Sequence, residues 1–149
     1  MITEIHFIVP AVPVAQPRQR SRIASGKGGK QFVQNYTPAK HPVNDFKAAV
    51  MHAARAAYSG PPLDVPLSMH VVFVMPRDNA KVWKTKPMPR EPYTKKKGDW
   101  DNLGKSLSDA LNQLVYTDDG LLCDVRVLRV MASGYEQPHV EVRISTEVE

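Results

Sequence analysis

Residues 67–75 read LSMHVVFVM, and this run decides how the rest of the chain is arranged. In an extended segment Val71 and Phe73 would lie on one face, and Val72 and Val74 on the other. Strands that are apolar on both faces usually lie inside a sheet, with other elements covering both sides. We therefore expect residues 67–75 to form a central strand that is covered on both faces.

Two amphipathic segments flank this run and predict two helices. Over residues 42–58, apolar residues recur at spacings of three and four. Over residues 101–114, a rotation of 100° per residue places the apolar residues on one side and Asp101, Lys105 and Asp109 on the other. We expect the apolar side of the second helix to pack on the sheet and its Asp-Lys-Asp side to face solvent or a ligand.

Three further segments, residues 5–14, 121–131 and 139–144, have the β-branched and apolar composition of strands. We expect the last two to pair with each other across a turn at residues 132–137. The order β-α-β-α-β-β predicts a single two-layer α+β domain over residues 1–149, with two main helices on a mixed β-sheet. A chain of 149 residues is long enough for one domain with its own core.

Two long connections are rich in proline and basic residues. Residues 17–42 are expected to form a long loop or an irregular hairpin, and loops of that length are usually functional or mobile. Residues 76–98 form the second connection. Residues 1–97 carry 16 Lys and Arg against 5 Asp and Glu, whereas residues 98–149 carry 4 against 10. The basic part suits phosphate groups, and the acidic part suits a metal ion.

The net charge of +5 and the sequence pI of about 9.4 favour a nucleic acid or another acidic partner. The single cysteine, Cys123, excludes an internal disulfide. Glu4 stands where a signal peptide would carry positive charge, and the apolar run around it is too short to span a bilayer. We expect a cytoplasmic protein that has no contact with a membrane.

Carboxylates gather around the start of the second expected helix. Asp99 and Asp101 stand two residues apart, Lys105 follows one helical turn later, and Asp118 and Asp119 come after the helix. If the next strand lies beside the helix N-terminus, one of the later pair can join the other two. Three carboxylates at one place repel one another unless a divalent cation lies among them, and Mg²⁺ prefers oxygen ligands. This set suits metal-assisted hydrolysis of a phosphodiester.

A purely structural interpretation of the same residues is also open. Asp99 and Asp101 are suitable helix N-caps, and residues 118–120 suit a plain turn. Lys105 could form surface pairs with Asp101 and Asp109, each worth about 0.2–0.5 kcal/mol. This interpretation predicts a DNA-binding protein without catalysis, in which Mg²⁺ changes nothing.

The acidic pattern extends over a longer stretch. It reads Asp99-x-Asp101-Asn-Leu-x-Lys105-x-x-x-Asp109-Ala-Leu-Asn, followed by Tyr116-x-Asp118-Asp119. This pattern resembles the RusA family of Holliday junction endonucleases. The resemblance implies a catalytic set of Asp99, Asp101, Lys105 and Asp119, with the three aspartates as metal ligands. It leaves Asp118 as a supporting residue or a further ligand.

The same resemblance implies a Mg²⁺-dependent homodimer in which Mn²⁺ can substitute, encoded by a phage or prophage and acting in a bacterial cell. Its substrate would be branched DNA, namely a four-way junction that is resolved by paired nicks. A nuclease that acts on other branched or flapped DNA is the alternative enzyme. Gly98 and Arg129 depart from the family, since many members have proline and lysine there, but neither change removes a catalytic group.

Six basic residues are candidate DNA contacts, and four aromatic residues are candidate stacking groups at an opened junction. The basic residues are Arg18, Arg20, Arg22, Lys95, Lys96 and Lys97. The aromatic residues are Tyr36, Trp83, Tyr93 and Trp100. The three lysines directly precede the acidic site and are placed to seat the scissile strand. Contacts of this kind position nucleic acid without reading its sequence.

Overall fold

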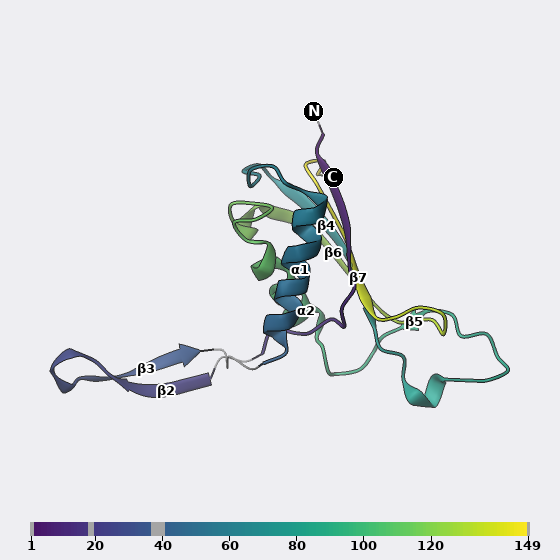
Figure 1. The fold of residues 1–149 in the computed structure, drawn as a ribbon, viewed down its shortest axis with the longest axis horizontal. Coiled ribbons are helices and arrows are strands. Elements are labelled where there is room, and N and C mark those ends of the chain that lie inside the picture. The colour runs from purple at the N-terminus through teal and green to yellow at the C-terminus, as the bar shows by residue number, and fades with distance from the viewer. Residues whose placement is uncertain (1, 18–19, 37–40, 149) are drawn as a thin grey trace.

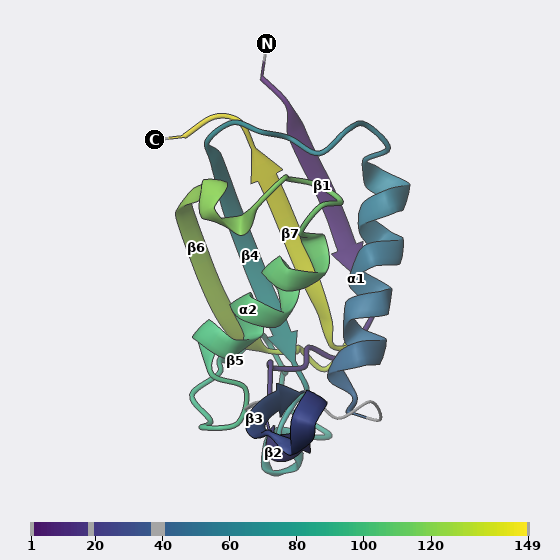
Figure 2. The same cartoon turned by 90° about the vertical axis from the view of Figure 1, so that its left-hand side faces the viewer.

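The computed structural model describes residues 2–17, 20–36 and 41–148. Its body is a five-stranded sheet with two helices, α1 (Val43–Ala57) and α2 (Trp100–Leu111), on one face (Figures 1 and 2). The strands of this sheet are β1 (Glu4–Val9), β4 (Leu67–Met75), β5 (Glu91–Pro92), β6 (Leu122–Met131) and β7 (His139–Ser145). A separate hairpin comprises β2 (Arg20–Ser25) and β3 (Gln31–Tyr36). The expected two-layer α+β architecture is confirmed, with the hairpin and the short β5 added to the predicted order.

The order of the strands in the sheet is β1-β7-β4-β6-β5. β4 and β6 run parallel, and the other neighbouring pairs run antiparallel. Parallel neighbours need a crossover connection, and here α2 lies within that connection. The sheet is therefore mixed, and β4 lies at its centre as its apolar sequence predicted.

The predicted pairing of β6 with β7 was wrong, because β4 lies between them. Val71 of β4 is aligned with Val127 of β6 on one side and with Val142 of β7 on the other. β6 runs parallel to β4 and ends beside it, where the backbone N–H of Ala132 donates to the carbonyl oxygen of Met75 (2.8 Å). The segment after β6 therefore crosses the end of β4 before the chain returns as β7.

Two elements are shorter than the sequence pattern suggested. β1 ends at Val9, since Pro10 has no backbone N–H with which to continue the ladder. α2 ends at Leu111, and Gln113 takes a φ of +65°, which a right-handed helix cannot include. The helix therefore stops three residues before the end of the apolar periodicity.

The hydrophobic core lies between the helices and the sheet. α1 buries Val43, Phe46, Val50 and Ala54. α2 buries Leu103, Ser106, Leu107, Ala110 and Leu111. Complete burial of a large aliphatic or aromatic side chain contributes roughly 1.5–3 kcal/mol, so these two stripes hold the helices on the sheet. The apolar stripe predicted for α2 is thus confirmed.

The other face of the sheet carries no helix in the part of the chain that the structure describes. Val72 of β4 and Leu128 of β6 line an open depression there, together with His6, His70 and Arg143. Leu128 is 55% exposed. The expectation that β4 is covered on both faces was therefore wrong, and one face of this sheet is accessible to solvent, as is common in sheets with antiparallel strands.

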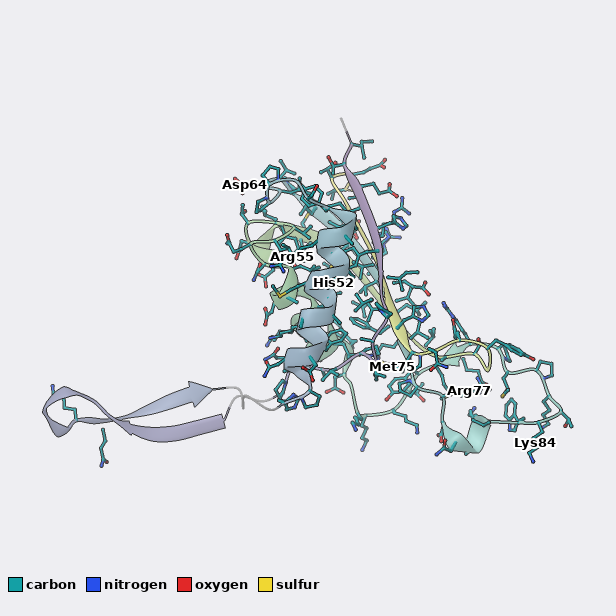
Figure 3. All side chains as sticks on the ribbon, viewed as in Figure 1. His52, Arg55, Asp64, Met75, Arg77 and Lys84 are labelled. Atoms are coloured by element: carbon teal, nitrogen blue, oxygen red, sulfur yellow. The ribbon has the colours of Figure 1, made fainter. Side chains whose placement is uncertain are left out.

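Two extensions leave the same end of the body in opposite directions (Figure 1). The β2–β3 hairpin projects on the side of the helices, so of the two forms expected for residues 17–42 the hairpin is the one found. The connection over residues 76–98 projects on the other side. Figure 3 shows Met75 at its root and Arg77 and Lys84 farther out. Within the described residues, neither helix combines the length and apolar character that a membrane crossing requires.

Candidate active site

α2 presents two acids and a lysine away from the sheet. Asp101, Lys105 and Asp109 are exposed, whereas Leu103 and Leu107 are completely buried. Within the described residues no ion pair joins Lys105 to either aspartate. Asp109 instead lies 4.0 Å from the Nζ atom of Lys47 on α1. The surface pairs that the structural interpretation assumed are therefore not formed.

Asp99 precedes α2 and contributes to its first turn through the backbone. Its carbonyl oxygen accepts a hydrogen bond from the N–H of Leu103 (2.9 Å), but its side chain makes no capping hydrogen bond. The preceding residue, Gly98, has a φ of +80°, and a Cβ atom there would lie 3.1 Å from Met75 Cε. Proline cannot adopt that φ, so glycine suits this turn. The turn leaves the Asp99 carboxylate exposed and available for a ligand.

Arg129 of β6 holds the turn that leads to Asp99. Its Nη1 atom donates to the carbonyl oxygen of Gly98 (2.9 Å) and to that of Lys95 (3.4 Å), and its guanidinium lies 5.3 Å from the ring centroid of Tyr93. The Tyr93 hydroxyl donates to the carbonyl oxygen of Lys97 (2.9 Å). The sequence indicated no role for Arg129, since a single arginine in a strand carries no local signal of a distant partner. Tyr93 is buried in this arrangement and is not placed for stacking on DNA.

The adjacent acids of the turn after α2 differ in what they contact. The Asp118 Oδ2 atom accepts a hydrogen bond from the N–H of Gly120 (2.9 Å), so Asp118 closes the turn. Asp119 opens a short 3₁₀ helix, η3 (Asp119–Leu121), and lines a pocket together with residues of α2. The spacing of the residues identified the pair without separating these roles, whereas the resemblance to the family placed Asp119 in the catalytic set and left Asp118 as a supporting residue or a further ligand.

Tyr116 joins the acidic turn at residues 118–120 to α2. It is completely buried, and its hydroxyl donates to the carbonyl oxygen of Ser108 (2.8 Å). Burial raises the pKa of Tyr116, and the negative charges of Asp119, Asp109 and Asp118 raise it further. The tyrosine therefore stays protonated and keeps its hydrogen bond, and the three carboxylates lie close enough to influence the same buried group.

Asp101 and Asp119 line one pocket of about 250 Å³ between α2 and β6. Its other lining residues are Met69, Trp100, Gly104, Ser108, Leu122, Val125 and Val127. Asp99 does not line it. Over residues 2–17, 20–36 and 41–148, no three Asp, Glu, His or Cys side chains lie close enough together to hold a metal ion. The structure thus brings together two of the three expected ligands.

The three candidate lysines lie in the exposed turn just before α2. Lys95 is paired, with its Nζ atom 2.9 Å from Asp78 Oδ2. The hydrogen bond from Lys95 lowers the pKa of Asp78 below its usual range, and a backbone N–H from Ala80 contributes as well. Neither Lys96 nor Lys97 makes an ion pair with a residue that the structure describes. Of the three lysines, Lys96 and Lys97 therefore have the ammonium groups that are more available to bind phosphate.

The segment before the hairpin is fastened to α2. The backbone N–H of Gln16 donates to the carbonyl oxygen of Asn102 (2.9 Å), and the Ser106 hydroxyl donates to that of Val14 (2.7 Å). Both acceptor and donor on α2 lie within one turn of Asp101 and Lys105. Residues 14–16, which precede the hairpin in the chain, therefore lie beside the acidic site.

The remaining candidates are placed less closely. Arg18 lies outside the described residues, whereas Arg20 and Arg22 belong to β2. Tyr36 ends β3. Trp83 is partly buried, with two cationic side chains within 5.3 Å of its ring centroid. Trp100, in contrast, is exposed at the start of α2.

Comparison with known proteins shows the family of this chain. The family model described as "Endodeoxyribonuclease RusA" matches residues 10–145, which include both helices, the acidic turn and every strand of the sheet after β1. A relative in Bacillus subtilis (strain 168), "Uncharacterized protein YqaN", is 35% identical over an alignment of length 147, and the match covers 94% of each chain. The chain therefore belongs to the RusA family of endodeoxyribonucleases.

Proposed function

We propose that this chain is a Mg²⁺-dependent endonuclease that resolves four-way DNA junctions by paired phosphodiester hydrolysis. Membership of the family supports cleavage of DNA. The observation that best supports a metal-assisted mechanism is the pocket in which Asp101 and Asp119 meet, with Lys105 one helical turn from Asp101. These three side chains have no ion-pair partner among the described residues, so their charges are available to a ligand.

The residues of this site fit magnesium. The candidate ligands are carboxylate oxygens, which hard cations prefer, and the described residues offer no thiol or imidazole in the pocket. Mg²⁺ typically binds one or two protein carboxylates and completes its shell with water and substrate phosphate. Asp101 and Asp119, which line the same pocket, would supply these two carboxylates. When bound, Mg²⁺ would polarise a phosphate oxygen and lower the pKa of a water molecule.

Lys105 has the charge and the position to assist hydrolysis. Its ammonium would stabilise the negative charge that develops on the attacked phosphate, or would orient the attacking water. Lys105 lies on the same exposed stripe of α2 as Asp101, so its charge would act at the reacting phosphate. Its removal should therefore slow the chemical step more than it weakens DNA binding.

The basic extensions would hold DNA against this acidic site. Lys96 and Lys97 directly precede the site, and the segment that comes before the hairpin of Arg20 and Arg22 is bonded to α2. Figure 1 shows that the hairpin reaches well away from the body. Phosphate contacts by these residues would offset the repulsion between the site's carboxylates and the DNA backbone.

We propose a homodimer as the active form. A four-way junction has two-fold symmetry, so a two-fold dimer would present one active site to each of two opposed strands. Light scattering after size exclusion would test this directly. A mass close to 33 kDa, twice the 16.7 kDa of one chain, is the expected result.

The decisive experiment is cleavage of an end-labelled synthetic four-way junction by the purified protein in Mg²⁺. EDTA and the variant Asp101→Asn serve as controls, and a duplex and a flap of the same sequence run alongside. Symmetric nicks on the junction alone, lost in both controls, are expected. Cleavage of the flap instead would indicate another structure-selective nuclease. Binding without cleavage in any divalent metal would indicate a non-catalytic DNA-binding protein.

A further inference from the structure

Trp100 is unusually exposed for its size and position. It stands between Asp99 and Asp101, and 61% of its surface is accessible. Large exposed apolar side chains at a candidate site are informative, because an exposed indole gains little from folding. Trp100 also lines the pocket that Asp101 and Asp119 share. It is therefore an aromatic surface at the edge of the acidic site.

The rest of this pocket is apolar where it meets the sheet. Met69 and Val127 form its floor with Leu122, and Val125 is 47% exposed beside them. Its volume of about 250 Å³ is below the roughly 300–1,000 Å³ typical of pockets for drug-sized ligands. A small apolar pocket of this kind suits one flat ring system whose attached polar groups remain outside the pocket.

Gly104 keeps this pocket open. It lies inside α2, where glycine is less favourable than alanine because its backbone loses more conformational freedom on folding. A Cβ atom at this position would meet no atom within 4 Å, so close packing does not require glycine here. Instead, Gly104 lines the pocket beside Trp100 and Asp101, and any side chain there would project into the space available to a ligand.

We propose that Trp100 and the apolar floor beside it hold an unstacked nucleobase of the DNA strand next to the scissile phosphate. This proposal rests on the proposed function, since it takes the ligand of the pocket to be DNA. Bases stack on aromatic side chains irrespective of their identity, which suits a subsite that holds DNA without reading its sequence. Trp100, Asp101 and Asp119 line the same pocket. A base held against Trp100 would therefore fix the position of the adjacent phosphate relative to the two aspartates.

The test is a double-mutant cycle in which variants of Trp100 are combined with DNA junctions that lack one base. Fluorescent four-way junctions, each with one abasic site among the nucleotides that flank the branch point, are titrated in Ca²⁺ in place of Mg²⁺. We expect one abasic position to weaken binding by the wild-type protein roughly 5- to 150-fold. Trp100→Ala should weaken binding of the intact junction by a similar factor and should then be insensitive to that abasic position. Trp100→Phe should retain most of the binding and the sensitivity.

Two further variants separate stacking from structure. Gly104→Leu introduces a good helix former, so the melting temperature should hold or rise while binding falls and loses its sensitivity to the abasic site. Tyr135→Ala removes an aromatic residue that is 89% exposed in the segment between β6 and β7, and it should bind every junction as the wild type does. The subsite is ruled out if the loss of affinity from Trp100→Ala and the loss from an abasic site multiply independently at every position tested. It is also ruled out if Trp100→Ala binds the intact junction as tightly as the wild type does.

The outcomes distinguish this proposal from the one on which it rests. A wild-type protein that cuts the junction in Mg²⁺ but shows no coupling between Trp100 and any base retains the proposed function and loses the subsite. A wild-type protein that shows the coupling in Ca²⁺ but cuts nothing in Mg²⁺ retains the subsite and loses the proposed function.

Discussion

The guanidinium of Arg129 donates a hydrogen bond of 2.9 Å to the carbonyl oxygen of Gly98. This contact joins the C-terminal part of β6 to the turn that precedes Asp99. The same guanidinium lies over the ring of Tyr93, whose hydroxyl donates a hydrogen bond to the carbonyl oxygen of Lys97. One strand residue therefore fixes the backbone on which a candidate metal ligand and a candidate DNA contact both stand.

Removing this clamp should impair cleavage without unfolding the protein. We expect Arg129→Ala to lower kcat/KM on a four-way junction about 10- to 100-fold, because small displacements of reacting groups have effects of this size. Arg129→Lys should recover part of the loss. Arg126→Ala is the matched control, since it removes an arginine of β6 on the opposite face of the sheet. Equal losses in the two alanine variants would show that Arg129 has no positioning role.

The two acids of the turn after α2 should differ in their effect on catalysis. Asp119→Asn should reduce cleavage by at least about 100-fold, since it removes a charged candidate ligand from the pocket. Asp118→Asn should have a much smaller effect, because the amide oxygen can still accept the hydrogen bond from Gly120. Single-turnover cleavage and gel-shift binding on the same junction measure both variants. The reverse order of effects would exchange the roles of the two residues.

The lysines before α2 should differ in how binding depends on salt. Lys96→Ala and Lys97→Ala should each reduce the slope of log K against log[salt] by about 0.9, the value expected for one phosphate contact. Lys95→Ala should reduce it less, since Lys95 is paired with Asp78 before DNA binds. Arg55→Ala is the control, because Arg55 lies in the last turn of α1, away from the hairpin (Figure 3). A slope that none of the three lysine variants changes would exclude this turn from the interface.

The ion pair between Arg90 and Glu136 should make stability fall in acid. Two hydrogen bonds from Arg90, of 2.8 and 2.9 Å, hold the pKa of Glu136 at about 2, below its ordinary value of 4.5. Above pH 4.5 the carboxylate is ionised in both the folded and the unfolded state, so the full stabilisation is present. As the pH falls from about 4.5 to about 2, the unfolded state takes up the proton first and the stabilisation is lost.

Urea denaturation across this range measures the effect. At pH 7, Glu136→Gln should lower the free energy of unfolding by about 1–2 kcal/mol, and the difference from the wild type should vanish near pH 2. Glu4→Gln, which breaks a more exposed pair with Arg143, should change it by less than about 0.5 kcal/mol. A difference for Glu136→Gln that is constant with pH would exclude the carboxylate as its source.

The parts of the fold that depend on local pattern could be predicted from the sequence. The bounds of β4 and the buried side of α2 follow from periodicity alone, because period and burial belong to the same few residues. The partner of β6 could not be predicted in this way. Strands joined by a short connection usually neighbour each other, and here the crossover through α2 places β4 between β6 and β7 instead.

The same division holds for the candidate site. Helical spacing was sufficient to place Asp101 and Lys105 on one exposed stripe. It could not show that Asp119 rather than Asp118 lines the pocket, because a hydrogen bond inside the turn decides that. Nor could it show the role of Arg129, whose partners lie more than thirty positions earlier in the chain.

The place of β7 in the sheet has a consequence for how the protein is made. β1 is paired with β7, which separates it from β4. While a ribosome is still synthesising the chain, the N-terminal strand therefore has no partner until residues 139–145 have emerged. The β4–β6 pair and both helices can assemble earlier, but the sheet closes in a single late step. A nascent or C-terminally truncated chain would expose the unpaired edges of β1 and β4, which are templates for pairing with other chains and for aggregation.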